Sequence, residues 1–145
     1  MRRVSATIMG TLTLVLGSCG SGDVATSHVE ANVPPQNQLL SMLERDLLAY
    51  FSTLSSIRVT KVDVMLLRDG PTQTGVAYPK YYAWVILRSD SSETRSGAVR
   101  VAAVDNTHLE VTDFISRETL RSDPQAVSHV FPAALVADIN RRALQ

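Results

Sequence analysis

The segment Tyr81–Leu87 (YYAWVIL) constrains the fold more than any other part of this sequence. It carries no charged residue, and apolar or aromatic side chains occupy both of its alternating faces. In an extended strand, successive side chains point to opposite faces of the sheet. A strand that is apolar on both faces has to be covered on both sides, which predicts a central strand with packed layers above and below the sheet.

A helical pattern precedes this strand between Gln36 and Ser55. Apolar residues recur there at spacings of three and four, the period of an amphipathic helix. These residues are Leu39, Leu40, Leu43, Leu47, Phe51 and Leu54. We expect this long helix to lie across one face of the sheet.

Three further segments show the two-residue period that is typical of strands. They cover residues 57–66, 98–104 and 108–114. In the first of them the apolar phase slips by one residue between Val59 and Val62, which predicts a β-bulge. The polar segment Arg88–Thr94 predicts a hairpin loop. Short connections between successive strands favour an antiparallel meander.

The C-terminal part returns to helical signals. Ser116, Asp123-Pro124 and Pro132 are each typical of a helix start. The sequence therefore predicts the α+β class: a long N-terminal helix packed on a four-stranded antiparallel sheet, followed by short C-terminal helices. This order of elements resembles the topology of cystatin-like and NTF2-like folds, and it assigns the domain to neither family.

The N-terminus has the features of a targeting segment. Arg2 and Arg3 precede an uncharged apolar run from Val4 to Leu16. This run fits the apolar region of a secretory signal and is shorter than the ~20 residues of a membrane-spanning helix. It leads into Leu16-Gly17-Ser18-Cys19, which contains the only cysteine of the chain. The whole segment resembles the signal peptide and lipobox of bacterial lipoproteins.

This resemblance implies that residues 1–18 are removed as a signal peptide and that Cys19 is lipidated. Several acyl chains together make a stable membrane anchor. Gly20 follows the cysteine, where many Gram-negative lipoproteins of the inner membrane have Asp, so we expect the outer membrane, facing the periplasm. Residues 19–35 are then a flexible tether and residues 36–145 a single domain. The alternative is an incidental free cysteine behind a chance apolar start.

The charge of the chain argues against a nucleic-acid partner. The sequence has 14 basic and 14 acidic residues. Loss of Arg2 and Arg3 with the signal peptide leaves 12 basic against 14 acidic residues, a net charge of −2. A slightly acidic chain has no basic field to attract phosphates.

The sequence offers little support for catalysis. It contains no nucleophile elbow, P-loop, HExxH or dinucleotide-binding fingerprint. His108 and Glu110 would share one face of a strand and could hold a water or a metal ion, but no third ligand accompanies them. The sequence therefore predicts neither a catalytic residue nor a metal site nor a cofactor.

A binding surface is the more specific hypothesis. The segment Asp69–Trp84 begins with a loop that is long for a hairpin and leads into aromatic residues. Tyrosine is enriched among interface anchors. We expect Tyr78, Lys80 and Tyr81 to contact a partner, although Tyr81 could instead cover one face of the sheet.

These observations favour a lipid-anchored envelope lipoprotein whose domain is a non-catalytic binding or accessory module. Its expected partners are the membrane, through the anchor, and a protein or another envelope component. The alternative is a small-ligand-binding or weakly catalytic pocket of the NTF2-like kind. A polar cluster lining a cavity between helix and sheet would favour the pocket, and a filled apolar interior would favour the interaction module.

Overall fold

The computed structural model of the chain describes residues 32–54, 58–75, 77–90 and 92–145. These residues form the elements α2 (Leu39–Leu54), β1 (Lys61–Leu66), β2 (Lys80–Ser89), β3 (Ser92–Ala103), β4 (Leu109–Ser116), α3 (Arg117–Ser122), the 3-10 helix η1 (Ala126–His129) and α4 (Ala133–Leu144). The strands form one antiparallel sheet in the order β1-β2-β3-β4. The predicted α+β class and the four-stranded antiparallel sheet are confirmed.

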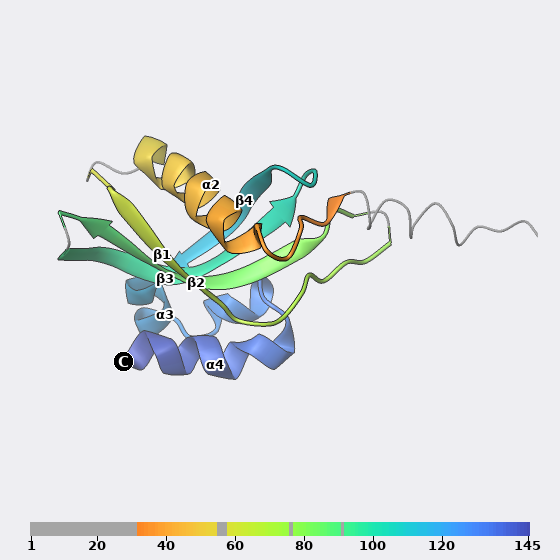
Figure 1. Cartoon of the computed structure of the whole chain (residues 1–145). Helices are drawn as coiled ribbons and strands as arrows, with labels where there is room; N and C mark the ends of the chain where they lie inside the picture. The colour runs from red at the N-terminus through yellow and green to blue at the C-terminus, as the bar shows by residue number, and fades with distance from the viewer. Residues whose placement is uncertain (1–31, 55–57, 76, 91) are drawn as a thin grey trace, which may run out of the picture.

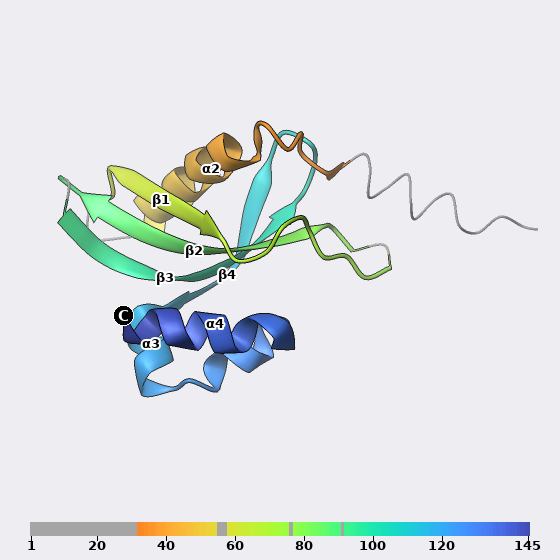
Figure 2. The same ribbon diagram turned by 60° about the horizontal axis from the view of Figure 1, so that its bottom comes forward.

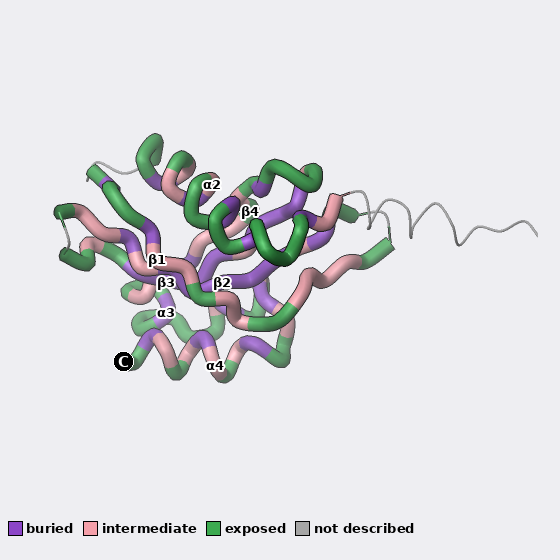
Figure 3. The backbone as a smooth tube through the Cα atoms, in the orientation of Figure 1, coloured by how far each residue is buried: buried purple, intermediate pink, exposed green. Residues whose placement is uncertain are grey.

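The domain has three layers. Helix α2 crosses one face of the sheet, and α3, η1 and α4 cover the other face (Figures 1 and 2). The inner strands β2 and β3 lie between these layers, and most of their residues are buried (Figure 3).

Strand β2 divides the core between the two faces, as its sequence predicts. Tyr81 and Val85 belong to the apolar cluster under α2, and their side chains are at most 1 % exposed. Tyr82 and Trp84 belong to the second cluster, which contains the C-terminal helices. Trp84 is 4 % exposed, and Arg117 stacks over its ring at 5.7 Å from the centroid.

The helix differs in detail from the expected pattern. Helix α2 begins at Leu39 instead of Gln36, and the chain forms a turn just before it. Leu43 and Leu47 are fully buried, but Leu40 and Leu54 are 50 % and 64 % exposed. The apolar stripe that faces the sheet is therefore narrower than the sequence pattern indicates.

The strand boundaries also correct the sequence analysis. Strand β1 begins only at Lys61, so the phase slip between Val59 and Val62 marks a strand start and not a bulge; Ile57 lies outside the described residues. The polar segment expected as a loop is mostly strand, because β2 runs to Ser89 and β3 begins at Ser92. The described polar residues at this end of the hairpin are exposed or half-buried, and polarity alone therefore did not distinguish strand from loop.

The bulges occur at other places. The register shifts between Leu87 and Arg88 in the pairing of β2 with β3. A second shift makes Thr112 the extra residue of β4, because Arg100 pairs with Asp113 and Val101 with Val111. Such an extra residue bends and twists the bulged strand.

Two of the three predicted C-terminal helix starts are found, whereas Asp123-Pro124 does not begin a helix: the chain forms a turn there, and the 3-10 helix η1 begins only at Ala126. Ser116 caps α3, and its hydroxyl accepts a hydrogen bond from the backbone N–H of Thr119 at 3.2 Å. Pro132 directly precedes α4. Buried Leu120, Val127 and Ile139 from these helices complete the second apolar cluster beneath Trp84.

Candidate functional site

A cavity of about 420 Å³ lies at the C-terminal end of α2, between that helix and the sheet. We call it the end cavity. Tyr50, Phe51 and Leu54 of α2 form one wall, and residues 112–115 of the edge strand β4 form the opposite wall. Leu87 and Arg95, from the two inner strands, and Val130, which lies between η1 and α4, complete the lining. Leu54 is 64 % exposed, so the cavity opens to solvent at this residue.

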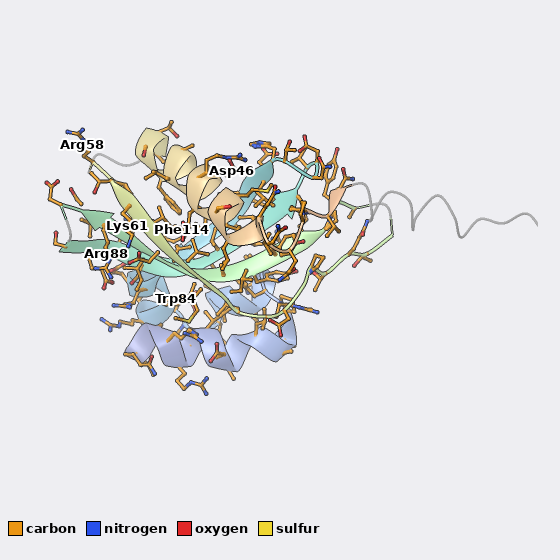
Figure 4. All side chains as sticks on the ribbon, viewed as in Figure 1. Asp46, Arg58, Lys61, Trp84, Arg88 and Phe114 are labelled. Carbon is orange, nitrogen blue, oxygen red and sulfur yellow. The ribbon has the colours of Figure 1, made fainter. Side chains whose placement is uncertain are left out.

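An aromatic group forms the inner part of the end cavity. The rings of Phe51 and Phe114 meet edge to face, with their centroids 4.9 Å apart and an interplanar angle of 74°. Tyr50 packs on Phe51 in the same manner at 5.1 Å. Phe114 lies on the α2 side of the sheet, opposite Trp84 (Figure 4). These rings give the cavity a preformed apolar wall.

Gly97 allows Phe114 to take this position. A Cβ atom at residue 97 would lie 2.3 Å from the carbonyl oxygen of Ile115 and 2.9 Å from Cε2 of Phe114. Real Cβ atoms essentially never approach other heavy atoms closer than 3.0 Å. Only glycine therefore lets β4 and the Phe114 ring pack this closely on β3.

The two charged residues of the end cavity differ in their partners. Asp113 is neutralised by Arg100, whose Nη2 and Nε lie 2.5 and 2.7 Å from Oδ2 of the carboxylate. Arg100 also donates to the carbonyl oxygen of Val130 at 3.0 Å, which fixes the guanidinium. Arg95, in contrast, is exposed and has no ion-pair partner within 4.0 Å among the described residues.

The charge of Arg95 acts on one acid at longer range. The pKa of Glu118 is lowered, mainly by a hydrogen bond from its own backbone N–H and by the Ser116 hydroxyl, with smaller contributions from the positive charges of Arg95 and Arg117. The carboxylate of Glu118 is thus held at the start of α3. Arg95 is the cation of the end cavity that remains available to a ligand.

A second cavity, of about 380 Å³, is lined by Thr60, Lys61, Asp63 and Arg88. Asp63 lies between two cations, 2.6 Å from Nζ of Lys61 and 2.5 Å from Nε of Arg88. Hydrogen bonds from both residues lower the pKa of Asp63. Lys61 and Arg88 lie with Arg58 at one end of the molecule (Figure 4). Because the Asp63 carboxylate already occupies these two cations, the cavity is poorly suited to an anionic ligand.

His108, which with Glu110 was a possible metal or water site, has a partner that the sequence did not indicate. Asp46 of α2 lies 3.6 Å from Nδ1 of His108 and accepts a hydrogen bond from the backbone N–H of Leu109 at 2.8 Å. Arg45 donates to the same carboxylate and also to the carbonyl oxygen of Thr107 at 2.6 Å. These contacts hold α2 against the β3–β4 connection. They give Asp46 a structural role and require no catalytic one.

The structure separates the three residues expected to bind a partner. Tyr78 is 43 % exposed and lies in the connection before β2, and Lys80 is half-buried at the first position of that strand. Tyr81 is 1 % exposed within the core, and its burial raises the pKa of its phenol. Tyr81 therefore has the role of a core residue, the alternative stated above, and only Tyr78 and Lys80 remain as surface candidates.

The long connection that carries Tyr78 is partly closed by hydrogen bonds. The backbones of Thr72 and Lys80 exchange two hydrogen bonds of 2.7 and 2.8 Å. The hydroxyl of Thr72 also forms a 2.7 Å hydrogen bond with that of Tyr82. Gly70 and Gly75 adopt positive φ angles of 68° and 59° in this connection, whereas Val76 lies outside the described residues. The exposed tip is therefore shorter than the sequence suggests.

The end cavity could not be recognised from the sequence. Phe51 and Phe114 are far apart in the chain, and each fits an ordinary core pattern. The one local signal is Gly97 within an otherwise regular strand, since an isolated glycine there often marks a close approach of another backbone.

Comparison of the chain with protein-family models, with curated proteins and with solved structures finds no match. Among the helices of the described residues, none combines the length and apolar character needed to cross a bilayer. Within the same residues, no three His, Cys, Asp or Glu side chains gather in a way that could hold a metal ion. Cys19 lies outside the part of the chain that the structure describes.

Proposed function

We propose that this protein is a lipid-anchored bacterial envelope lipoprotein whose domain is a non-catalytic binding module. The anchor rests on one observation: Leu16-Gly17-Ser18-Cys19 follows a basic start and an uncharged apolar run. The proposed location is the outer membrane, on its periplasmic side. Figure 1 places the first described residues and the β2–β3 hairpin at opposite ends of the domain. Tethering before residue 32 would thus leave the hairpin end, with the end cavity, accessible.

The anchor is tested by metabolic labelling with a fatty-acid analogue. Cys19→Ala should abolish labelling, because it removes the thiol that would receive the lipid. Ser21→Ala, two residues further on, is the matched control and should be labelled like the parent chain. Equal labelling of the Cys19→Ala variant and the parent would contradict the proposal.

The proposed contact surface for a protein or envelope component consists of Tyr78 and Lys80. Tyrosine is enriched among the residues that dominate interface energetics, and Tyr78 is 43 % exposed. Crosslinking in intact cells, followed by capture of the chain and mass spectrometry, tests this surface. If Tyr78 is a buried anchor in the complex, Tyr78→Ala should lower the recovery of the partner about thirtyfold.

Leu144→Ala is the matched control, because Leu144 is also apolar and is 76 % exposed on another element. Recovery of the partner should be unchanged in this variant. Equal recovery with the parent chain and with Tyr78→Ala would show that the contact surface lies elsewhere.

A small-ligand-binding function is the second candidate, and the end cavity supports it. Its volume of about 420 Å³ falls in the range of small-molecule sites, which extends from about 300 to 1,000 Å³. Such sites are typically apolar with a few polar groups that orient the ligand. The interior between α2 and the sheet is otherwise filled by apolar side chains, which favours the interaction module.

A further inference from the structure

The lining of the end cavity identifies the class of ligand that would fit it. We propose that the end cavity binds a small single-chain carboxylate, with its apolar body against Phe51, Phe114 and Leu54 and its anionic head at Arg95. This inference rests on the second function proposed above, small-ligand binding, and adds the chemistry of the ligand.

The apolar part of the argument comes from the walls. Phe51 is 4 % exposed and Leu87 2 % exposed, so the base of the cavity belongs to the rigid core. The ring of Phe114 is fixed by Phe51 on one side and by the backbone at Gly97 on the other. A ligand would therefore meet a preformed surface, which lowers the entropic cost of binding. The exposed Leu54 side chain at the opening would gain cover from the same ligand.

The charge of the ligand follows from the pairing of the two ionic groups. The Asp113 carboxylate forms an ion pair with Arg100, which contacts Oδ2 through two nitrogen atoms, so its charge is compensated and attracts a ligand cation less than a free carboxylate would. Arg95 presents a guanidinium without an ion-pair partner among the described residues at the same cavity. A guanidinium binds carboxylates through two parallel N–H···O hydrogen bonds, and it forms these more readily than an ammonium group does.

The ligand should be small and have a single alkyl chain. The cavity has a volume of only about 420 Å³, and the buried core closes its inner end. An apolar alcohol could fill the same space, but it would bring no negative charge into direct contact with the Arg95 guanidinium. An amine would bring a second positive charge close to Arg95. The three head groups therefore separate the contribution of the apolar walls from that of the guanidinium.

The test uses membranes that carry the full chain and three photoreactive probes: decanoate, decanol and decylamine, each with a diazirine on its alkyl chain. After illumination, mass spectrometry locates the label along the chain. The expected label lies on the wall of the end cavity, at residues 50–54 or 112–115. Comparing variants for each probe cancels the different partitioning of the probes into the membrane.

Arg95→Gln should lower decanoate labelling of these residues about three- to tenfold. This effect lies between the loss of an exposed ion pair and the loss of a hydrogen bond to a charged group. Decanol labelling should be unchanged. Arg95→Lys should keep part of the preference for decanoate. Arg58→Gln, which removes an exposed arginine outside the lining of the end cavity, is the matched control and should behave like the parent chain.

Leu54→Glu tests the cavity from its opening. It places a negative charge at the opening, where the apolar body of the ligand is expected to lie, and it should lower decanoate labelling at least as much as Arg95→Gln. Leu40→Glu changes another exposed leucine of the same helix, outside the cavity lining, and should have no effect. Because all the substituted side chains are exposed, thermal melting of each variant should match the parent chain.

The outcomes distinguish the ligand class from the function beneath it. Decanoate labelling that depends on Arg95 supports the proposal. Equal loss or equal retention of decanoate and decanol labelling in Arg95→Gln overturns the anionic ligand but leaves a small-ligand site in place. Absence of label from the cavity residues with all three probes overturns both the ligand class and the small-ligand function.

Discussion

Gly97→Ala is expected to destabilise the domain by about 2 kcal/mol, although it adds only one methyl group. The new Cβ would lie 2.3 Å from the carbonyl oxygen of Ile115, so β3 and β4 must separate by about 0.7 Å to reach the 3.0 Å limit of real contacts. Overpacking of this kind costs about 1–3 kcal/mol, and the upper end applies because the obstacle is backbone. The lower entropy of the unfolded alanine chain returns up to about 1 kcal/mol.

Urea unfolding of the chain from Gly20 onward measures this loss through the fluorescence of Trp84, the only tryptophan. With a slope of about 1–3 kcal/mol per molar urea, the midpoint should fall by about 1 M. When Gly97→Ala is made in a Phe114→Leu chain and compared with Phe114→Leu alone, its cost should be only slightly smaller. The leucine relieves the 2.9 Å contact with the ring but leaves the 2.3 Å contact with the backbone.

Gly70→Ala provides the control for conformational strain without crowding. Gly70 has a φ of 68°, and a Cβ atom at this residue would meet no other atom within 4 Å. Its substitution should therefore cost about 1–2 kcal/mol through backbone strain alone. A change below about 0.5 kcal/mol in Gly97→Ala would refute the close approach of β4 to β3. Full recovery in the double variant would assign the cost to the Phe114 ring instead.

Three further predictions concern single side chains. Trp84→Ala should cost about 3–5 kcal/mol, as expected for removal of a large buried side chain, and a loss below about 1 kcal/mol in urea unfolding followed by circular dichroism would contradict its core position. Asp63→Asn should flatten the acid side of the stability profile. Because Lys61 and Arg88 lower the folded pKa of Asp63, its stabilisation is present above the ordinary value of 3.8 and is lost as the pH falls through the lowered pKa. A variant profile parallel to that of the parent chain would contradict this. Tyr78→Ala should leave the melting curve within about 0.5 kcal/mol of the parent, and a larger loss would place Tyr78 in the core.

The central features of the fold were predictable because they depend on local patterns. The alternation in Tyr81–Leu87 indicates a strand covered on both faces, and Ser116 and Pro132 mark helix starts by their own chemistry. The errors occur where tertiary contacts decide. Val59 is 6 % exposed but does not belong to a strand. Its apolar side chain therefore looked like part of an alternating strand pattern, and the break in alternation before Val62 was interpreted as a bulge.

The candidate site was less predictable because its parts meet only in the folded chain. The sequence directed attention to the aromatic residues around β2, but Tyr81 is needed in the core and cannot also face a partner. Arg95 follows directly on a segment expected to be a loop, where a charged residue has no particular meaning. Pairing of Leu87 with Arg95 places this arginine on the strand face under α2, beside the aromatic group.

The contacts of α2 explain why the cavity occurs at this end of the domain. At the other end of β4, Arg45 and Asp46 of α2 bind the β3–β4 connection and hold the helix against the sheet. At the C-terminal end of the helix, Phe51 makes the last buried contact and Leu54 is left exposed. Phe114 fills part of the space because Gly97 lets it lie close to β3. The cavity therefore results from the close contact of Phe114 with β3 and from the lack of a buried contact at Leu54. A ligand in the cavity would cover the part of the sheet beyond the last buried turn of α2.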